Sequence, residues 1–222
     1  SSLSATDKSA IAQTLEALEN LPGYRLDVQY YNPSELEEQL IQKKLDYFIG
    51  TSGFYRRFQS FGLRSVATLF TETAPNPRYA TGSVFVVRND SPIKTISELK
   101  GKSALASWSK GFSSYFAPMG EISKQGFDPE SFFAAYKTYG PPMTNLLQKL
   151  ENHEGDVVLI RACLLEDLEK TQPDIFKRFR VLEEKKDNRL RCKHSTDLYP
   201  NWTLVATPSA PWTETREITN VC

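Results

Sequence analysis

The chain has 222 residues, 40% hydrophobic and 24% charged, which is the composition of a folded globular protein rather than a disordered one. Its 27 basic residues balance its 27 acidic residues, which excludes a protein that binds nucleic acid or a membrane surface through its overall charge. The longest apolar runs, such as Val84–Val87 and Val157–Ile160, are too short to cross a bilayer, and no signal peptide is visible.

The first part of the chain alternates predicted helices and strands. Apolar spacing predicts a helix over Lys8–Asn20, and polar–apolar alternation predicts a strand over Leu26–Tyr30. The stretch Asn32–Glu35 carries a capping asparagine, a proline in the first turn and a glutamate three residues after the cap, so it predicts a second helix start. A short apolar strand follows at Tyr47–Ile49 and leads into the loop Thr51–Tyr55. This order is typical of α/β proteins.

The same order returns after residue 82. Strands are predicted at Gly82–Arg88, Ser103–Ala106 and Asp156–Arg161, the last of these a continuous apolar run typical of a sheet covered on both faces. The polar stretch Glu184–Pro200 lacks periodicity and, taken alone, is typical of a solvated loop. The other predicted elements are a short capped helix from Thr95 to Gly101, helices over about 113–125, 143–152 and 162–170, and strands at 179–183 and 202–207.

Cysteine usage leaves the redox state open. Cys163, Cys192 and Cys222 are too few for a disulfide-stapled miniprotein, and together with His153 and His194 they fit no zinc-binding spacing. A disulfide between Cys163 and Cys192 would suit an oxidising compartment, and the alternative is three separate thiols. We expect no metal site.

In doubly wound sheets, ligands bind beyond the carboxyl ends of the strands, and this rule selects the loops Thr51–Tyr55, Ser107–Ser114 and Arg161–Cys163. Ser113 and Ser114 lie at a predicted helix start, where free backbone N–H groups and the helix dipole favour an anion. Ser113 alone would be explained as an N-cap, but the agreement of three loops favours binding. The candidate ligand-binding residues are Thr51, Ser52, Tyr55, Trp108, Ser113, Ser114, Tyr139 and Arg161.

Catalytic motifs are not evident. The sequence shows no nucleophile–base pair, carboxylate dyad or glycine-rich nucleotide-binding motif, and the pair Cys192 and His194 is too short a pattern to indicate catalysis. We therefore expect a binding domain with no catalytic residue and no cofactor. The alternative is a thiol-dependent enzyme that uses Cys163 or Cys192 as its nucleophile.

Several stretches resemble the type II periplasmic binding proteins, and most closely their phosphonate-binding, PhnD-like branch. They are Gly82–Arg88, Asp90–Ile93 and Ile96–Lys102, which are similar to that family's hinge strand and "DLKGK" segment, and Leu45–Gly50 and Gly155–Val158, which are similar to one strand in each lobe. The resemblance implies an α/β fold of two lobes, each a mixed sheet flanked by helices, joined by two hinge strands. It also implies that Ser113 and Ser114 hold the anionic group of the ligand.

Two further stretches, Arg161–Glu166 and Cys192–Trp202, are similar to the sensor regions of bacterial histidine kinases of the tetrathionate-sensor type. This resemblance implies that Glu184–Pro200 is more than a solvated loop. One departure from the binding-protein pattern affects the ligand, because Thr51–Tyr55 stands where the family has the loop N-P-G-x-Y. The pair Cys163 and Cys192 then indicates a sensor rather than a transport protein.

Together these resemblances imply a periplasmic sensor domain, the extracytoplasmic part of an inner-membrane histidine kinase. The first lobe is expected at 1–88 with 198–222, the second at 91–195, and the ligand in the cleft between them. The expected partners are a small anionic solute (a phosphonate, sulfur oxyanion or carboxylate) and membrane-anchored kinase segments outside this chain, with no nucleic acid. The alternative with the same fold is the solute-binding component of a phosphonate- or oxyanion-type ABC transporter.

Overall fold

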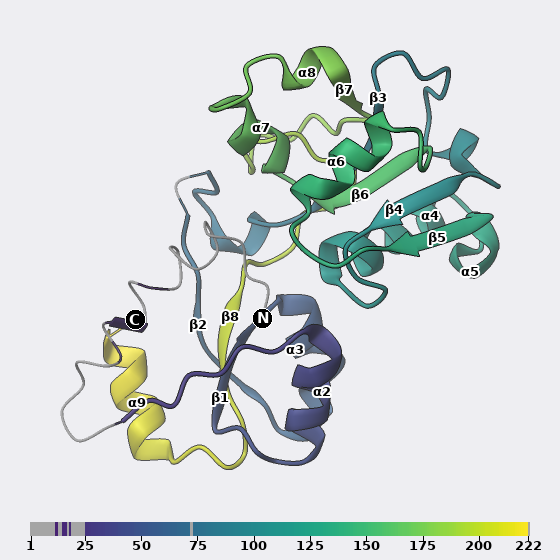
Figure 1. Ribbon diagram of the computed structural model, residues 1–222. Coiled ribbons are helices and arrows are strands. Elements are labelled where there is room, and N and C mark those ends of the chain that lie inside the picture. The colour runs from purple at the N-terminus through teal and green to yellow at the C-terminus, as the bar shows by residue number, and fades with distance from the viewer. Residues whose placement is uncertain (1–11, 13–14, 17, 19–24, 72, 222) are drawn as a thin grey trace. The chain divides into compact units, whose positions relative to one another are not determined.

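The computed structural model describes residues 12, 15–16, 18, 25–71 and 73–221. Two compact units divide the chain, the first formed by Ser1–Leu69 with Trp202–Cys222 and the second by Phe70–Asn201. Each unit has a sheet of its own, flanked by helices (Figure 1). The predicted mixed α/β fold is therefore confirmed. Within the described part of the chain, every helix is too short or too polar to span a bilayer.

The first unit is built around strand β8 (Thr203–Ala206), the central strand of a three-stranded sheet ordered β1-β8-β2. Both β1 (Tyr47–Gly50) and β2 (Arg64–Thr68) run antiparallel to it. One face of this sheet packs in a core with Leu40, Phe58 and Leu63. The helices of this unit are α2 (Pro33–Ile41), α3 (Ser52–Arg57) and α9 (Trp212–Val221), with a 3-10 turn at Gln59–Phe61.

The predicted start of α2 is confirmed in atomic detail. The Asn32 side chain accepts hydrogen bonds of 2.9 Å from the backbone N–H groups of Ser34 and Glu35. In return, the Glu35 carboxylate accepts a 2.8 Å bond from the Asn32 N–H. This reciprocal capping box satisfies donors that a helix start otherwise leaves unpaired.

Two predictions near the N-terminus have different outcomes. The strand predicted at Leu26–Tyr30 is wrong, because residues 25–32 pair with no strand and the side chains of Val28 and Tyr30 are exposed. Alternation describes a two-faced strand, but a strand also needs a hydrogen-bonding neighbour. The helix predicted over Lys8–Asn20 lies mostly outside the described residues. The described members Ala12, Leu15, Glu16 and Leu18 are helical.

The second unit has a five-stranded mixed sheet ordered β5-β4-β6-β3-β7. Strand β4 (Ser103–Ala106) runs parallel to β5 (Ala135–Thr138) and β6 (Val157–Arg161). Strand β3 (Ser83–Arg88) runs antiparallel to β6 and to β7 (Phe179–Val181). The sequence assigns Gly82–Arg88 to the first lobe, whereas β3 lies inside the sheet of this second unit.

Helices cover both faces of the second sheet, which explains its continuous apolar strands. On β3, Val84 and Val86 face one core and Phe85 and Val87 face the other. The first core is closed by α6 (Thr144–Glu151), α7 (Leu164–Glu169) and α8 (Ile175–Arg178). The second core is closed by α4 (Ala117–Lys124) and α5 (Pro129–Phe132), with a 3-10 turn at Ser97–Leu99.

Within the segment 184–200, residues 190, 194–196 and 198 are buried while most of 184–189 is exposed, so the segment is more than a solvated loop, in agreement with the resemblance drawn from the sequence. His194, Ser195 and Thr196 are at most 1% exposed. The N–H groups of Ser195 and Thr196 both donate to the carbonyl oxygen of Ser83, at 2.9 and 3.3 Å. The segment therefore lies along the start of β3 like an irregular strand, on the edge where β7 pairs with the end of β3.

Candidate functional site

The carboxyl ends of β4, β5 and β6 meet at one edge of the second sheet, because the three strands are parallel. Ser107 follows β4, Tyr139 follows β5, and Arg161 ends β6. Backbone bonds hold the first two loops together: the Tyr139 N–H donates to Ala106 at 3.1 Å and the Gly140 N–H to Ser107 at 3.0 Å. The sequence thus selected loops that the fold brings to a common edge.

A single π-helical turn, Phe112–Phe116, leads from this edge into α4. The Gly111 carbonyl accepts two hydrogen bonds, from the N–H groups of Tyr115 at 2.9 Å and Phe116 at 3.2 Å. Within the described structure, the N–H groups of Phe112, Ser113 and Ser114 have no hydrogen-bond acceptor. Free N–H groups at the start of a helix attract anions, and π-turns are frequent at functional sites.

Ser114 locks the loop that precedes the turn. Ser114 is 1% exposed, and its hydroxyl donates a 2.9 Å hydrogen bond to the Trp108 carbonyl. A Cβ atom on Gly111 would lie 2.3 Å from the Ser114 Oγ, so no larger residue fits there without displacing the serine. The Ser114 hydroxyl is thus committed to the protein, and its backbone N–H remains for a ligand.

The hydroxyls of Ser113 and Ser107 are different. Ser113 is half-buried, and its Oγ makes no hydrogen bond to the described residues. Ser107 is 1% exposed, and its Oγ lacks a protein partner among the described residues. A buried hydroxyl without a partner is uncommon and calls for a ligand or water. Ser107 lies in one of the three predicted loops but is not among the predicted ligand-binding residues.

Arg161 brings a positive charge to this edge at the end of β6. Its guanidinium donates to Asp167 at 2.8 Å and to the Ala162 carbonyl at 3.2 Å, and its side chain is 25% exposed. Its backbone lies opposite Ser83 in the β3–β6 pairing. Asp167 also contacts Lys170, so the acid holds two cations. The guanidinium is therefore held in one orientation, with donors left over for a ligand.

The two predicted aromatic walls are placed differently. Trp108 is half-buried in the loop closed by Ser114. The Tyr139 ring is 39% exposed and lies 4.2 Å from the Lys149 ammonium, while its hydroxyl reaches Glu154 at 3.4 Å. Their role as walls of a ligand site stays a prediction.

The predicted residues of the first unit lie at the start of α3, which corrects the expectation of an open loop. Thr51 is the N-cap of this helix, and its Oγ1 accepts a 3.2 Å bond from the Phe54 N–H. Ser52 and Tyr55 belong to the helix itself and are half-buried. Thr51 resembled a loop residue because a six-residue helix is too short to show apolar periodicity. The cleft that would unite these residues with those of the second unit stays a prediction.

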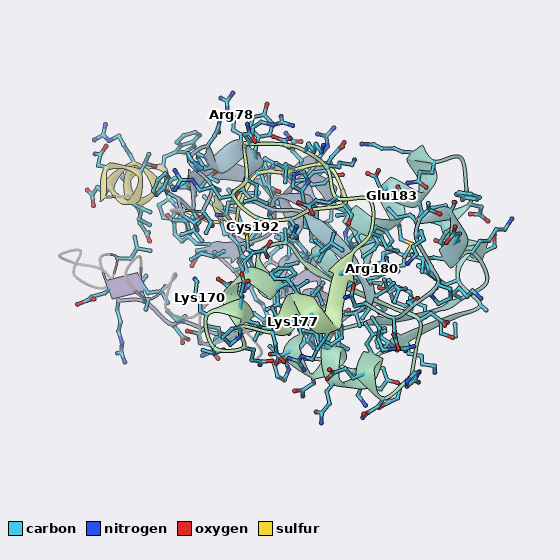
Figure 2. The ribbon with its side chains drawn as sticks, turned by 90° about the horizontal axis from the view of Figure 1, so that it is seen from above. Arg78, Lys170, Lys177, Arg180, Glu183 and Cys192 are labelled. Carbon is cyan, nitrogen blue, oxygen red and sulfur yellow. A yellow bond between two sulfur atoms is a disulfide. The ribbon has the colours of Figure 1, made fainter. Side chains whose placement is uncertain are left out.

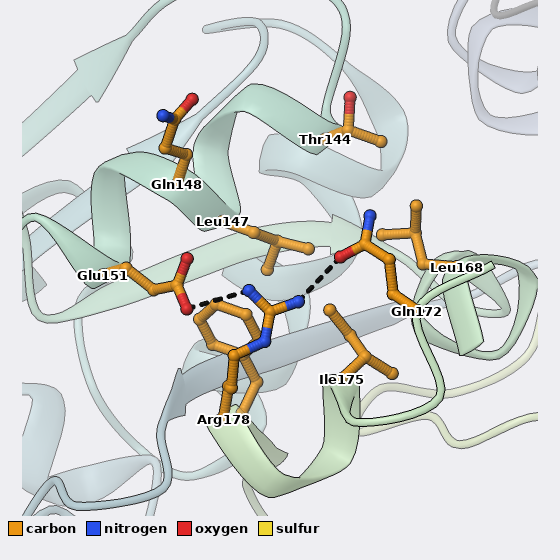
Figure 3. Close-up of a pocket in the computed structure, with 9 residues that line it drawn as sticks. Thr144, Leu147, Gln148, Glu151, Leu168, Gln172, Ile175 and Arg178 are labelled. Carbon is orange, nitrogen blue, oxygen red and sulfur yellow. Dashed lines mark hydrogen bonds and ion pairs between the residues drawn. The ribbon is translucent and has the colours of Figure 1, made fainter.

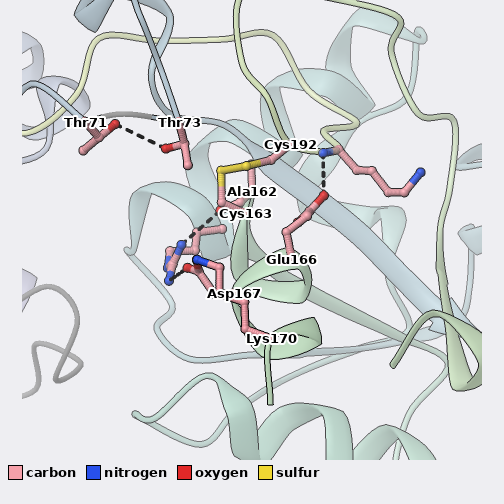
Figure 4. The surroundings of a disulfide bond; sticks show 10 residues. Thr71, Thr73, Ala162, Cys163, Glu166, Asp167, Lys170 and Cys192 are labelled. Carbon is pink, nitrogen blue, oxygen red and sulfur yellow. Dashed lines mark hydrogen bonds and ion pairs between the residues drawn. A yellow bond between two sulfur atoms is a disulfide. The ribbon is translucent and has the colours of Figure 1, made fainter. Parts of the chain in front are cut away.

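Cys163 and Cys192 form a disulfide (Figure 4). Cys163 precedes α7 in a left-handed conformation, with φ of 68°. Beside the bond, the Glu166 carboxylate accepts a 2.7 Å hydrogen bond from the Lys193 N–H. Cys192 lies on the segment between the loop that carries Arg78 and the end of α7 at Lys170 (Figure 2). The disulfide thus joins the end of β6 to the segment 184–200.

A separate concavity of about 280 Å³ lies among α6, α7, α8 and β7 (Figure 3). The guanidinium of Arg178 lies in it and is paired with Glu151 at 3.0 Å and Gln172 at 2.7 Å. None of the predicted ligand-binding residues lines this concavity. Among the described residues no cluster of histidine, cysteine or acidic side chains fits a metal ion.

Three functional candidates escaped sequence reasoning: Ser83, Ser107 and Tyr136. Ser83 was assigned to a hinge strand, and Tyr136 lies in β5, a strand that was not predicted. Both hydroxyls donate to carbonyl groups of the π-turn. Burial raises the pKa of Tyr136 well above its usual range, and so its hydroxyl keeps the proton that it donates. The available signal was Ser83 itself, the polar first residue of an apolar strand.

Comparison with known proteins decides the family. The family model described as "ABC transporter, phosphonate, periplasmic substrate-binding protein" matches residues 3–221. The chain belongs to this family. The PhnD-like resemblance found in the sequence is thereby confirmed, and the family's description names periplasmic substrate binding.

Among curated proteins, this family member is similar to the tetrathionate sensor histidine kinase TtrS of Salmonella typhimurium. The two are 28% identical over 201 residues, which is 90% of this chain and 33% of TtrS. The chain thus spans about a third of the length of this curated relative. The resemblance to a kinase sensor region, drawn from the sequence, is confirmed by this match.

Several solved structures share the fold. XAC2383 from Xanthomonas citri bound to ATP has a TM-score of 0.72 at 19% identity, covering 96% of this chain and 76% of its own. A binding-protein component of an ABC phosphonate transporter from Pseudomonas aeruginosa has 0.67 at 16%, covering 98% and 69%. PhnD1 from Prochlorococcus marinus in complex with methylphosphonate has 0.66 at 15%, covering 96% and 79%.

Proposed function

We propose that the chain is the extracytoplasmic sensor domain of a two-component histidine kinase and that it recognises a small anionic solute. The observation that carries this proposal is the row of three backbone N–H groups, Phe112 to Ser114, with no acceptor among the described residues. These donors begin a continuous helical segment that runs to Lys124, so the helix dipole adds to their attraction for an anion. Arg161 and the Ser107 hydroxyl would supply further donors from neighbouring strand ends.

The chemistry of the donors limits the ligand class. Backbone N–H and hydroxyl groups bind oxyanions without regard to the central atom, and a phosphonate, a sulfur oxyanion or a carboxylate fits them equally. Two names from the comparisons supply probes: tetrathionate, which TtrS is named for sensing, and methylphosphonate, which PhnD1 binds. Closure of the two units on the ligand, as implied by the family resemblance, remains part of the proposal.

A sensor is favoured over a transport component by the similarity to TtrS and by the resemblance of Arg161–Glu166 and Cys192–Trp202 to kinase sensor regions. The disulfide holds the second of these stretches against β6. In the transport alternative, the same domain would deliver its solute to a permease, as the family description suggests for its members. The two alternatives differ in the rest of the gene: kinase segments support the sensor, and a lipoprotein signal without them supports transport.

The thiol-enzyme alternative loses support from the disulfide. A nucleophilic cysteine acts as a thiolate, and neither Cys163 nor Cys192 has a thiol when the two are bonded. Rapid stoichiometric alkylation of either residue in the untreated protein would favour the enzyme alternative. A mass reduced by two hydrogens and no alkylation of Cys163 or Cys192 before reduction would favour the binding domain.

Binding is tested by calorimetry with tetrathionate, methylphosphonate, inorganic phosphate and sulfate, combined with amide NMR. We expect at least one anion to bind and to shift the amide resonances of Phe112, Ser113 and Ser114. Ser113→Ala should weaken that anion about tenfold, because a hydrogen bond to a charged group is removed. Ser123→Ala, which removes an exposed hydroxyl at the other end of α4, is the control. Binding that leaves these three amides unshifted would place the ligand elsewhere.

A further inference from the structure

Pro118 leaves the π-turn short of one hydrogen-bond donor. In this turn the Ala117 N–H donates to the carbonyl of Phe112, five residues earlier. The same spacing would make residue 118 the donor to Ser113, and α-helical spacing would make it the donor to Ser114. Proline has no N–H, so the helix backbone cannot supply either bond. One carbonyl of the turn depends on a donor from elsewhere.

Side chains from two strands donate to the two carbonyl groups that residue 118 would otherwise reach. Ser83, at the start of β3, donates its hydroxyl to the Ser113 carbonyl at 2.8 Å. Tyr136, on β5, donates its hydroxyl to the Ser114 carbonyl. Ser83 is 0% exposed and is itself fixed, since its N–H donates to the Thr196 hydroxyl at 3.0 Å. The carbonyl groups of Ser113 and Ser114 are thus each held by a side chain of a strand.

The direction of a carbonyl fixes the direction of an N–H group. The Ser113 carbonyl and the Ser114 N–H belong to one planar trans peptide unit and point to opposite sides. When Ser83 holds the carbonyl, it therefore aims the Ser114 N–H. Tyr136 acts in the same way on the next peptide unit, whose Tyr115 N–H closes the turn on Gly111 at 2.9 Å. Ser83 thus orients the free Ser114 N–H directly, and Tyr136 fixes the peptide unit that follows it and keeps the turn closed.

We infer that Ser83 and Tyr136 are positioning residues for anion recognition, and that they aim the N–H groups of the turn without touching the ligand. This inference rests on the proposed function of the turn. Because Pro118 has no N–H to donate, side chains of β3 and β5 hold the turn in its place and so contribute to ligand affinity. Preorganised donors bind an anion more tightly, because no reorganisation is needed on binding.

The test compares Ser83→Ala and Tyr136→Phe with the wild-type chain by calorimetry, using tetrathionate and methylphosphonate as probes. We expect each variant to bind the better probe about tenfold more weakly, as for the loss of one oriented hydrogen bond. Tyr47→Phe is the matched control, because it removes a half-buried hydroxyl contact of 3.1 Å to Thr215 in the other unit. The control should keep the wild-type affinity.

A readout that needs no ligand separates positioning from general destabilisation. We expect Ser83→Ala to shift the Ser114 amide resonance and to change its hydrogen-exchange rate at temperatures far below unfolding. Tyr47→Phe should leave that amide unchanged. An unchanged Ser114 amide in Ser83→Ala would overturn the positioning role, whether or not a probe binds.

A rescue variant uses the proline itself. Pro118→Ala restores an N–H at residue 118, which can then donate to the Ser113 or the Ser114 carbonyl. We expect the loss caused by Ser83→Ala to shrink severalfold in the Pro118→Ala background, a coupling measured by a double-mutant cycle. Additive losses would overturn the inference, and so would wild-type affinity in both single variants. If no probe binds the wild-type chain while the Ser114 amide responds as expected, the proposed function fails and the positioning role stands.

Discussion

The N–H of Ser83 donates a 3.0 Å hydrogen bond to the Oγ1 of Thr196, which lies 113 residues away in the sequence. Ser195 makes a similar contact, because its hydroxyl accepts from the Phe85 N–H at 3.3 Å and donates to Leu182 at 2.7 Å. The segment that resembles a kinase sensor region is therefore bonded to β3. Through Ser83 it also supports the turn that carries the candidate anion site.

Thr196→Val tests this link. Valine keeps the shape of threonine but cannot accept the Ser83 N–H, which would remain buried without a partner. We expect the free energy of unfolding to fall by about 1–3 kcal/mol, measured by urea denaturation. Thr171→Val is the control, since it removes an exposed hydroxyl bond to Leu168, and it should change stability by less than about 0.5 kcal/mol. Equal losses in both variants would contradict a specific role for Thr196.

Loss of the disulfide should destabilise the second unit. The bond closes a loop between residues 29 positions apart. A closed loop of that length lowers the entropy of the unfolded chain and so stabilises the folded protein by about 3–4 kcal/mol. We expect the Cys163→Ser, Cys192→Ser double variant to unfold at correspondingly lower urea concentration. The comparison is made in a Cys222→Ser background, so that no third thiol exchanges with the pair. A double variant as stable as its parent would show that the segment 184–200 holds without the bond.

Asp197 predicts a pH dependence. Its hydrogen bond with Lys124, opposed in part by burial and assisted by Lys185, holds the pKa of Asp197 below its usual value. A depressed carboxyl pKa contributes stability above the unfolded-state value of about 3.9, and this contribution is lost as pH falls through the folded-state pKa. Asp197→Asn should therefore be less stable than wild type at pH 7, by no more than about 1 kcal/mol because the pair is half exposed.

The difference between Asp197→Asn and wild type should shrink at pH 3, where the wild-type carboxylate begins to take up a proton. It should also shrink in 1 M salt, because exposed charges are screened over about 3 Å at that concentration. Urea unfolding at pH 7 and pH 3, each at low and high salt, measures both effects. A difference that stays constant across these conditions would assign the loss to packing rather than to charge.

The capping box of α2 gives a prediction for the first unit. Asn32→Ala removes the acceptor for the N–H groups of Ser34 and Glu35. We expect a loss of about 1 kcal/mol in the free energy of unfolding. Glu35→Gln keeps an oxygen that accepts the Asn32 N–H, so thermal unfolding of this variant should stay close to wild type. If Glu35→Gln lowers stability as much as Asn32→Ala does, the negative charge of Glu35 near the helix start contributes more to stability than the capping hydrogen bonds.

The sequence predicted the elements that carry strong local signals. The box at Asn32 and the covered strands at Val84–Val87 and Val157–Ile160 are confirmed, because caps and continuous apolar runs are written in adjacent residues. Strand β5 was missed because its outward residues are polar and only its pairing with β4 makes it a strand. Leu26–Tyr30 failed for the converse reason, as it has the alternation and no partner strand.

The candidate site was predicted by position but not by hydrogen bonding. The rule of strand ends selected the loops after β4 and β6, which the parallel strands bring to one edge of the sheet; that these loops bind a ligand stays a prediction. It did not reveal that the Ser114 hydroxyl is bound to Trp108, nor that Ser83 and Tyr136 hold the turn. Those contacts join residues from 6 to 30 positions apart, beyond the reach of local patterns.

The central strand of the first sheet, β8, is the last strand in the chain. Both β1 and β2 pair with β8 and with no other described strand, so the first sheet has no hydrogen-bonded ladder until residue 206 has been synthesised. The whole second unit is synthesised before that point, and it is one continuous stretch of chain, so it can fold as a unit of its own. The inserted second unit is therefore synthesised in full before the first sheet can form, because β1 and β2 have no strand to pair with until β8 is present.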